Sequence, residues 1–185
     1  LYLNPQTPQK FKDLLEEYKK RATMNLILAY VDCTEFRPRV AEIIKKLVKI
    51  DTRYVLTCRC DNDDMLAKEY ISSMKKNFRP IKNLFIDFIR GYNLNYKDKS
   101  LNTYKSRSNH FIGYVDDLNK NDLQSVFCSE HAFIKEKGWI RRIDNKTYPL
   151  WCEIIHGTNF VNYVQGDKAN QDMIDYLNNH FEYKH

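Results

Sequence analysis

Long apolar runs are missing from this chain of 185 residues. The longest, such as residues 26–31, fall far short of the roughly 20 residues that a membrane-spanning helix needs, and no signal-peptide segment is visible at the start. We therefore expect no transmembrane segment. Glycine and proline are also scarce, with five of each, so low-complexity linkers between domains are not expected.

Cysteine is present in an odd number and without a metal-binding pattern. The repeated Cys-x2-Cys pairs of zinc sites are missing, and the spacing is irregular. The thiols are therefore predicted to be reduced, as in cytoplasmic proteins, rather than bound to zinc. The five cysteines are Cys33, Cys58, Cys60, Cys128 and Cys152.

A long block of basic residues is likewise absent, although the formal net charge is +6. This modest excess favours anionic partners in general, such as nucleotide phosphates or anionic lipid headgroups. Because the basic residues are scattered, we expect no dedicated nucleic-acid binding and no basic nuclease. Hydrophobic residues make up 43 % of the chain and aromatic residues 14 %, which is typical of a folded domain rather than a disordered one.

The first half of the chain alternates between helical and strand-like patterns. Thr7 and Pro8 form a good helix start, because a hydroxyl can cap the helix and proline suits its first turn. The apolar side chains that follow lie on one helical face: Phe11, Leu14, Leu15 and Tyr18.

We expect the elements after this helix to alternate as well. They are a strand over residues 24–31, a helix over 40–48, a strand over 54–60 and a helix over 65–77. This alternation favours an α/β fold with a parallel sheet covered by helices. Ligands of such sheets bind at the carboxyl ends of the strands, where residues 61–64 would lie.

The second half is predicted to add a mixed or antiparallel extension and a last helix. Residues 93–96 and 101–105 flank a polar turn and read as a hairpin. The remaining predictions are short strands over residues 111–115, 125–127, 139–143 and 151–155, and a polar helix over 168–178.

The segment Asp61-Asn62-Asp63-Asp64 crowds three carboxylates into four residues. Their mutual repulsion is unfavourable unless a cation is present, and Mg²⁺ and Mn²⁺ take oxygen ligands and bridge carboxylates to diphosphates. Arg59, just upstream, could balance the charge or contact a phosphate. The alternative is structural: Asp64 caps a helix that begins near residue 65, and the other acids are solvated turn formers. The sequence pattern leaves both interpretations open.

Four blocks in this chain resemble a known family. Residues 57–65 resemble the signature TxRxDNDD of the rhamnosyltransferase family, which is related to family 2 glycosyltransferases. Residues 91–94 resemble its GYxL turn, residues 108–111 its SNxF segment, and residues 149–159 its PxWxxxIHGxN block. The blocks follow in the same order between residues 54 and 162. The chain departs from the pattern at Asp116, where glutamate is expected.

The resemblance implies a GT-A type mixed sheet flanked by helices, in a single domain over residues 1–185. A donor-binding part would span residues 1–80, an acceptor and metal part 81–166, and a C-terminal helix 167–185. Residues 1–3 resemble the second strand of such a fold, which implies that the first strand-helix unit is missing from the chain.

The resemblance also implies a metal-dependent, inverting glycosyltransferase that uses a nucleotide-sugar donor. Its acceptor would be a glycan or lipid-linked hydroxyl in polysaccharide biosynthesis, at a cytoplasmic location that can be peripheral to the membrane. The alternative is an inactive or truncated GT-A domain that acts as a binding module. The implied ligands of Mn²⁺ or Mg²⁺ are Asp61, Asp63 and His156.

The resemblance assigns the remaining roles as follows. The implied donor-binding residues are Arg59, Asp61, Asn62 and Asp64. The implied catalytic base is Asp116, with Asp117 and Glu130 as alternatives, and His131 could contact the acceptor or a phosphate. Among the tryptophans, Trp139 and Trp151 could stack on sugar rings, and the apolar run around Trp151 favours a core position for it.

Overall fold

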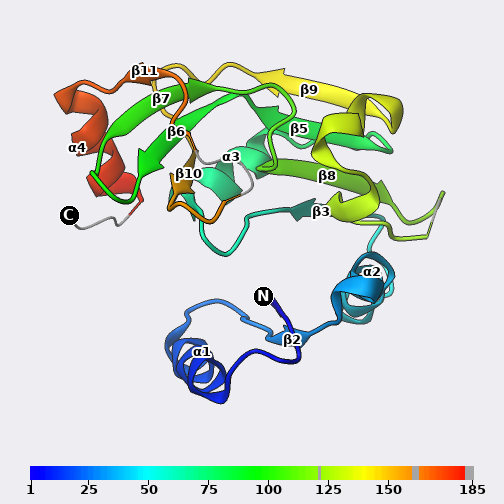
Figure 1. Cartoon of the computed structure of the whole chain (residues 1–185). Coiled ribbons are helices and arrows are strands. Elements are labelled where there is room, and N and C mark those ends of the chain that lie inside the picture. The colour runs from blue at the N-terminus through cyan, green and yellow to red at the C-terminus, as the bar shows by residue number, and fades with distance from the viewer. Residues whose placement is uncertain (121, 160–162, 182–185) are drawn as a thin grey trace. The chain divides into compact units, whose positions relative to one another are not determined.

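The computed structural model describes residues 1–120, 122–159 and 163–181. The chain divides into two compact units, unit 1 over residues 1–49 and unit 2 over residues 50–185 (Figure 1). The domain prediction had placed both in one domain. Every residue predicted for the site belongs to unit 2.

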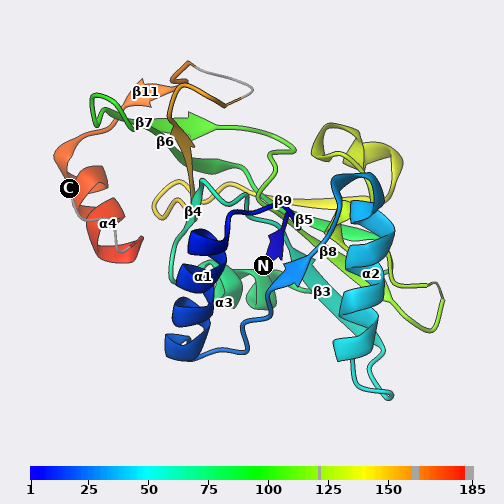
Figure 2. The same ribbon diagram turned by 60° about the horizontal axis from the view of Figure 1, so that its bottom comes forward.

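Unit 1 is a strand-helix-strand-helix segment. Strand β1 pairs with β2 in parallel, with Tyr2 opposite Ala29, so the predicted parallel pairing is present here. Figure 2 shows the chain running from α1 through β2 into α2. The elements are β1 (Tyr2–Leu3), α1 (Gln9–Arg21), β2 (Ala29–Tyr30), the 3₁₀ helix η1 (Cys33–Glu35) and α2 (Phe36–Leu47).

Two details of unit 1 differ from the sequence prediction. The strand predicted over residues 24–31 is reduced to the two residues of β2, because only these pair with β1. The N-cap position of α1 is Pro8, and no side chain caps this helix, so the predicted Thr7 cap was wrong.

The first sheet of unit 2 has four strands in the order β3-β8-β5-β9. Strand β8 is antiparallel to both neighbours, and only β5 and β9 are parallel to each other. The expectation that the strand before the acidic segment belongs to a parallel sheet was therefore wrong. The bounds are β3 (Tyr54–Cys58), β5 (Leu84–Phe88), β8 (Ile112–Asp117) and β9 (Trp139–Ile143).

The second sheet has five strands in the order β11-β7-β6-β10-β4. The hairpin of β6 and β7 is antiparallel, as predicted. Residues 65–66 were predicted to begin a helix, but they form β4 because they pair with β10. The bounds are β4 (Met65–Leu66), β6 (Arg90–Asn95), β7 (Leu101–Lys105), β10 (Trp151–Ile155) and β11 (Asp167–Lys168).

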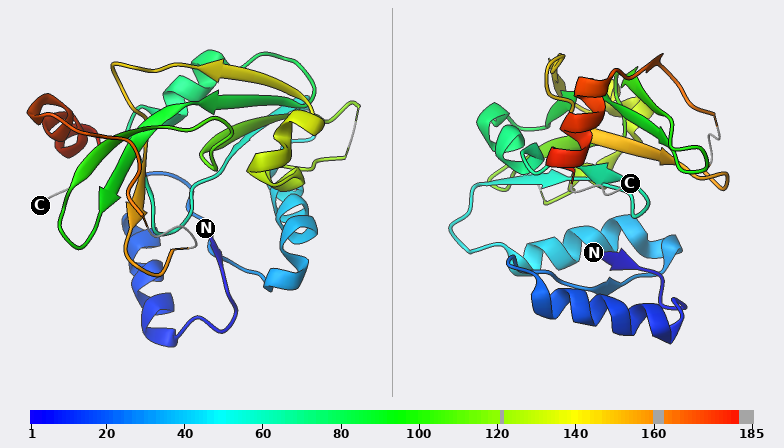
Figure 3. Two further views of the ribbon diagram at one scale, coloured as in Figure 1. Left: turned by 45° about the horizontal axis from the view of Figure 1, so that its top comes forward. Right: turned by 90° about the vertical axis from the view of Figure 1, so that its left-hand side faces the viewer.

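Helices cover these sheets. Helix α3 (Tyr70–Asn77) buries Tyr70 and Met74, and α4 (Gln171–His180) buries Leu177 in the same core cluster. Figure 3 shows α4 beside the β6–β7 hairpin. Two 3₁₀ helices, η2 (Val126–Cys128) and η3 (His131–Glu136), complete the unit, so the strand predicted over residues 125–127 was wrong.

Trp151 anchors the core between the two sheets. Its indole Nε1 donates to the carbonyl of Phe88 at 2.6 Å, and its ring stacks on Phe111 with centroids 4.9 Å apart. A Cβ atom at Gly91 would lie 2.1 Å from this ring, so only glycine fits there. The predicted core position of Trp151 is confirmed.

The architecture is a mixed α/β fold with sheets flanked by helices. Among the described residues, no helix combines the length and apolar character needed to cross a membrane.

Candidate functional site

The acidic segment forms a tight turn between two strands of different sheets. Strand β3 ends at Cys58, and β4 begins at Met65. The backbone N–H of Asp64 donates to the carbonyl of Asp61 at 3.2 Å, which closes the turn. The acidic side chains therefore lie past the carboxyl end of β3, as predicted.

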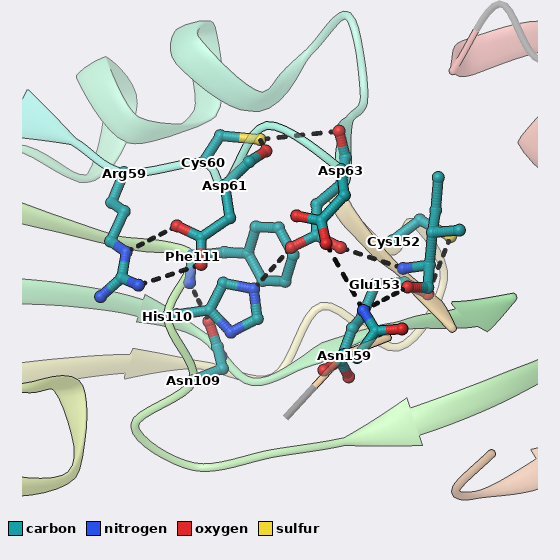
Figure 4. A network of polar contacts seen from close by, with 12 residues as sticks. Arg59, Cys60, Asp61, Asp63, Asn109, His110, Phe111, Cys152, Glu153 and Asn159 are labelled. Atoms are coloured by element: carbon teal, nitrogen blue, oxygen red, sulfur yellow. Dashed lines mark hydrogen bonds and ion pairs between the residues drawn. The ribbon is translucent and has the colours of Figure 1, made fainter. Parts of the chain in front are cut away.

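Arg59 holds the first carboxylate of this turn. Its Nε and Nη2 donate to the two oxygens of Asp61 at 2.8 and 3.0 Å, a bidentate pair (Figure 4). Burial opposes ionisation of Asp61, but the Arg59 guanidinium outweighs this effect, with smaller contributions from His110 and His131. The pKa of Asp61 therefore lies below its ordinary value, and the carboxylate is ionised at neutral pH.

Asp64 joins three segments of unit 2. Its Oδ2 lies 2.8 Å from Nε2 of His110, and its Oδ1 accepts from the backbone N–H of Ile154 at 3.0 Å. Its side chain is only 4 % exposed. The N-cap of α3 is Glu69, so the alternative in which Asp64 caps that helix was wrong.

The third acid meets the histidine that follows β10. Asp63 Oδ2 lies 2.9 Å from Nε2 of His156, and Thr158 Oγ1 lies 2.9 Å from the other ring nitrogen. The turn after His156 needs Gly157, whose φ of +91° is in the left-handed region. The structure thus brings together Asp63 and His156, two of the three predicted metal ligands, from positions 93 residues apart.

The buried carboxylate of Asp87 holds the loop that carries His110. Asp87 accepts from the backbone N–H of Ser108 at 2.8 Å and from Nδ2 of Asn109 at 2.9 Å, and Arg142 lies 3.4 Å away. Burial raises the pKa of Asp87, while these donors and Arg142 oppose the rise. Asp87 therefore anchors the loop without reaching the acidic turn.

Three side chains are close enough together to hold one cation. Ligand atoms of Asp61, Asp64 and His110 all lie within 4.8 Å of one another. Two carboxylates and one imidazole form a donor set that suits Mn²⁺. Mg²⁺ would use mainly the carboxylate oxygens of this set. Sequence analysis missed His110, although it occupies the variable position of the SNxF segment.

A cavity of about 490 Å³ opens beside the acidic turn. Glu153 of β10 lines it, half-buried, and accepts a hydrogen bond from Nδ2 of Asn93 at 2.9 Å. Burial raises the pKa of Glu153, and repulsion from Asp64 and Asp63 adds to the rise against the opposing effects of His110 and Asn93. The other charged or imidazole side chains that line the cavity are Arg59, Asp61, Asp63, Asp64, His110 and His131.

Three predicted site residues do not line this cavity. One of them, His156, pairs with Asp63, which does line it. Asn62 is exposed in the turn. Asp116 is buried, and its two oxygens accept from the backbone N–H groups of Gln124 and Ser125, both at 3.0 Å. Asp116 lies opposite Val55 in β3. Val55 is three residues before the end of β3, so about 10 Å of strand separates it from Cys58.

The alternative bases and the exposed tryptophan also lie outside the cavity lining. Asp117 is buried beside Arg53 at 3.6 Å, and Glu130 is the N-cap residue of η3. Trp139 is exposed on β9 and lines a different cavity. The structure therefore brings six sequence-assigned residues to one cavity: Arg59, Asp61, Asp63, Asp64, His131 and Trp151. His156 is joined to this group through Asp63.

These observations define a mixed α/β protein with an acidic, imidazole-containing site beside a cavity. The family model described as "Putative rhamnosyl transferase" matches residues 1–132, so the chain belongs to the rhamnosyl transferase family. The match includes the acidic turn and the loop of His110, and it ends before the block of residues 149–159. No curated protein and no solved structure matches the chain. Membership of this family suggests a glycosyltransferase.

Proposed function

We propose that the cavity beside the acidic turn binds the diphosphate of a nucleotide-sugar together with Mn²⁺ or Mg²⁺. The protein would transfer the sugar to a hydroxyl group of a glycan or lipid-linked acceptor, with inversion at the sugar carbon, in the assembly of a polysaccharide. The observation that supports this proposal most is the convergence of Asp61, Asp64 and His110 within 4.8 Å at the cavity wall.

The donor atoms fit a divalent ion. Asp61, Asp64 and His110 would hold it, and Asp63 with His156 lies next to them as a further carboxylate-imidazole pair. A bound ion would supply positive charge that stabilises the departing diphosphate. This role also accounts for the crowding of carboxylates, which is unfavourable without a cation.

The chain supplies cationic and aromatic groups around this position. Arg59 is bonded to Asp61 and also lies over the ring of Phe127, so its guanidinium is held at the cavity wall, where it can donate to a phosphate oxygen. His131 lines the same cavity, and its Nδ1 lies 2.7 Å from the carbonyl of Ser108. Donor binding by Asn62 remains a prediction from the family signature.

We assign the acceptor base to Glu153 rather than to Asp116. Inverting transfer needs a carboxylate that can take the proton of the acceptor hydroxyl. Glu153 faces the cavity from β10 and is oriented by Asn93, while both oxygens of Asp116 accept backbone hydrogen bonds elsewhere. The raised pKa of Glu153 makes it a stronger base once it has ionised.

The test is metal-dependent turnover of a panel of UDP-, GDP- and dTDP-sugars. Release of the nucleoside diphosphate is measured by chromatography with Mn²⁺, with Mg²⁺ and with a chelator. We expect release from one class of donor, dependent on the ion and lost in Asp64→Asn. Asp167→Asn, an exposed acid of β11 outside the cavity, is the matched control and should retain activity.

The binding-module alternative predicts a different result. Donor would then raise the melting temperature without any release of nucleoside diphosphate, because a ligand that binds only the folded state stabilises it. If donor neither binds nor reacts in the presence of the ion, the proposal is contradicted.

A further inference from the structure

Helix α1 carries an apolar face that the rest of unit 1 leaves uncovered. Phe11, Leu14 and Tyr18 are 48, 42 and 50 % exposed, and the helix contains no buried residue. Single exposed apolar side chains are normal on protein surfaces, but three adjacent ones at helical spacing form a patch. An apolar patch with a charged rim is the arrangement that interaction surfaces have.

Basic residues of α1 flank this apolar face on both sides. At about 100° per residue, Phe11, Leu14, Leu15 and Tyr18 occupy a sector about 100° wide. Within about 60° of its edges lie four basic residues, two on each side, and one acidic residue, Glu17, on the side of Lys10. Lys10 and Arg21 form one flank, and Lys12 and Lys19 form the other.

Two of the three acidic residues of α1 lie on the opposite side of the helix. Asp13 and Glu16 project away from the apolar sector, together with Lys20, and Glu16 lies 3.6 Å from Lys19. Basic residues on both flanks of the apolar sector suit an interface where apolar chains meet anionic headgroups.

The basic side chains already associate with the aromatic rings of this face. Lys10 lies 4.9 Å from the ring centre of Phe11, and Arg21 lies 4.9 Å from that of Tyr18. Lys12 donates to the carbonyl of Pro5 at 2.8 Å, which fixes the chain that enters the helix. Cations next to half-exposed rings are arranged for an interfacial position, where rings insert and the charged ends stay with the headgroups.

We propose that α1 is an interfacial helix that docks on an anionic lipid surface through Phe11, Leu14 and Tyr18, with its four flanking cations on the headgroups. Amphipathic helices with basic flanks and large apolar side chains bind such surfaces by apolar burial and electrostatic attraction together. The surface lies within unit 1, so the proposal stands whether or not the cavity of unit 2 transfers a sugar.

The test is co-sedimentation of the whole chain with lipid vesicles. Vesicles of phosphatidylcholine alone are compared with vesicles that contain roughly one quarter phosphatidylglycerol, at low and high salt. We expect binding to the anionic vesicles that weakens as salt rises. Equal binding to both kinds of vesicle, or no binding to the anionic ones, would overturn the proposal.

Paired variants locate the binding surface. Phe11→Ser with Tyr18→Ser should weaken binding by about tenfold or more, because two rings no longer leave water. Phe11→Leu with Tyr18→Leu keeps an apolar face and should bind within a few-fold of the unchanged chain. Asp13→Asn with Glu16→Gln, on the opposite face, is the control and should not weaken binding.

Two further results would overturn the proposal that α1 docks on lipid. If the serine variant binds vesicles as well as the unchanged chain, α1 is not the lipid surface. If the unchanged chain is a dimer in solution and the serine variant a monomer that is otherwise folded by circular dichroism, the face is a contact between two copies, and the proposal is overturned.

Discussion

Nε2 of His110 lies 2.8 Å from Oδ2 of Asp64, although 46 residues separate the two in the chain. Asp64 is held by the backbone of Ile154, and the loop of His110 is held by Asp87. Both partners are thus fixed from outside the pair. The pair stands at the wall of the cavity that we propose as the donor site.

Replacing His110 should weaken metal binding without unfolding the chain. His110→Ala removes one of the three converging ligand groups, and its imidazole is partly exposed on a loop rather than in the core. We expect the affinity for Mn²⁺ to fall by at least about tenfold, measured by calorimetric titration. His180→Ala is the matched control, because His180 pairs with Glu69 outside the cavity and should leave the affinity unchanged.

Replacing Glu153 should slow transfer while donor binding persists. Glu153→Gln keeps the size of the side chain and its contact with Asn93 but removes the basic carboxylate. We expect kcat to fall by about 10²–10⁴-fold with little change in the KM for donor. A variant with unchanged kcat would exclude Glu153 as the base.

The pH dependence should reveal the same group. Burial and nearby acids raise the pKa of Glu153, so the base ionises above the ordinary glutamate value of about 4.3, and kcat should rise as pH passes through the raised pKa. The rise of kcat with pH should be missing from the residual activity of Glu153→Gln.

The contribution of Glu153 to folding stability should fall as pH rises, whereas kcat should increase. Because the folded-state pKa of Glu153 is raised, its contribution to stability is present below the unfolded pKa and is lost as pH rises through the folded value. Glu153→Gln should therefore gain stability relative to the unchanged chain as pH rises above the ordinary glutamate pKa of about 4.3, measured by urea unfolding. A relative loss as pH rises would contradict the cause assigned to the shift.

Replacing Asp116 should affect stability. Asp116→Asn has only one side-chain oxygen for the two backbone N–H groups of Gln124 and Ser125. We expect the free energy of unfolding to fall by about 1–3 kcal/mol, measured in urea, because a buried donor loses its partner. Unchanged stability with lost activity would instead return the catalytic role to Asp116, as the family resemblance implied.

The contact between Gly91 and Trp151 predicts a large effect of one methyl group. In Gly91→Ala the new Cβ would lie 2.1 Å from the indole, so the free energy of unfolding should fall by about 3 kcal/mol. Gly157→Ala meets no neighbouring atom but must adopt a positive φ, which costs about 1–2 kcal/mol. Urea unfolding of both variants should give this order, and the reverse order would contradict it.

Local patterns predicted several elements of unit 2 well. Strands β9 and β10 have the predicted bounds, and the β6–β7 hairpin forms around the polar turn, because these short apolar runs end at turn-forming residues. Strand β4 could not be found in this way. Its two residues follow a helix-like pattern and become a strand only because Trp151 and Cys152 pair with them from far along the chain.

The site was predicted in part for the same reason. The acidic turn and its partner His156 are visible because they lie in family blocks, and the structure brings Asp63 and His156 together. His110 gives no local signal of its role, since its position depends on buried Asp87 and on the turn at Ser108. The burial of Asp116 could not be predicted, because the backbone groups that donate to its carboxylate belong to a loop that local pattern does not place.

The most direct test of the central proposal is the coupling between metal and diphosphate in one cavity. A nucleoside diphosphate is titrated calorimetrically into the protein with and without Mn²⁺, and Mn²⁺ is titrated with and without the nucleotide. If the acidic turn holds both together, each should raise the affinity for the other by the same factor, and Asp64→Asn should abolish the coupling. If the affinity for each ligand is the same with and without the other, a metal-dependent donor site at Asp61, Asp64 and His110 is contradicted.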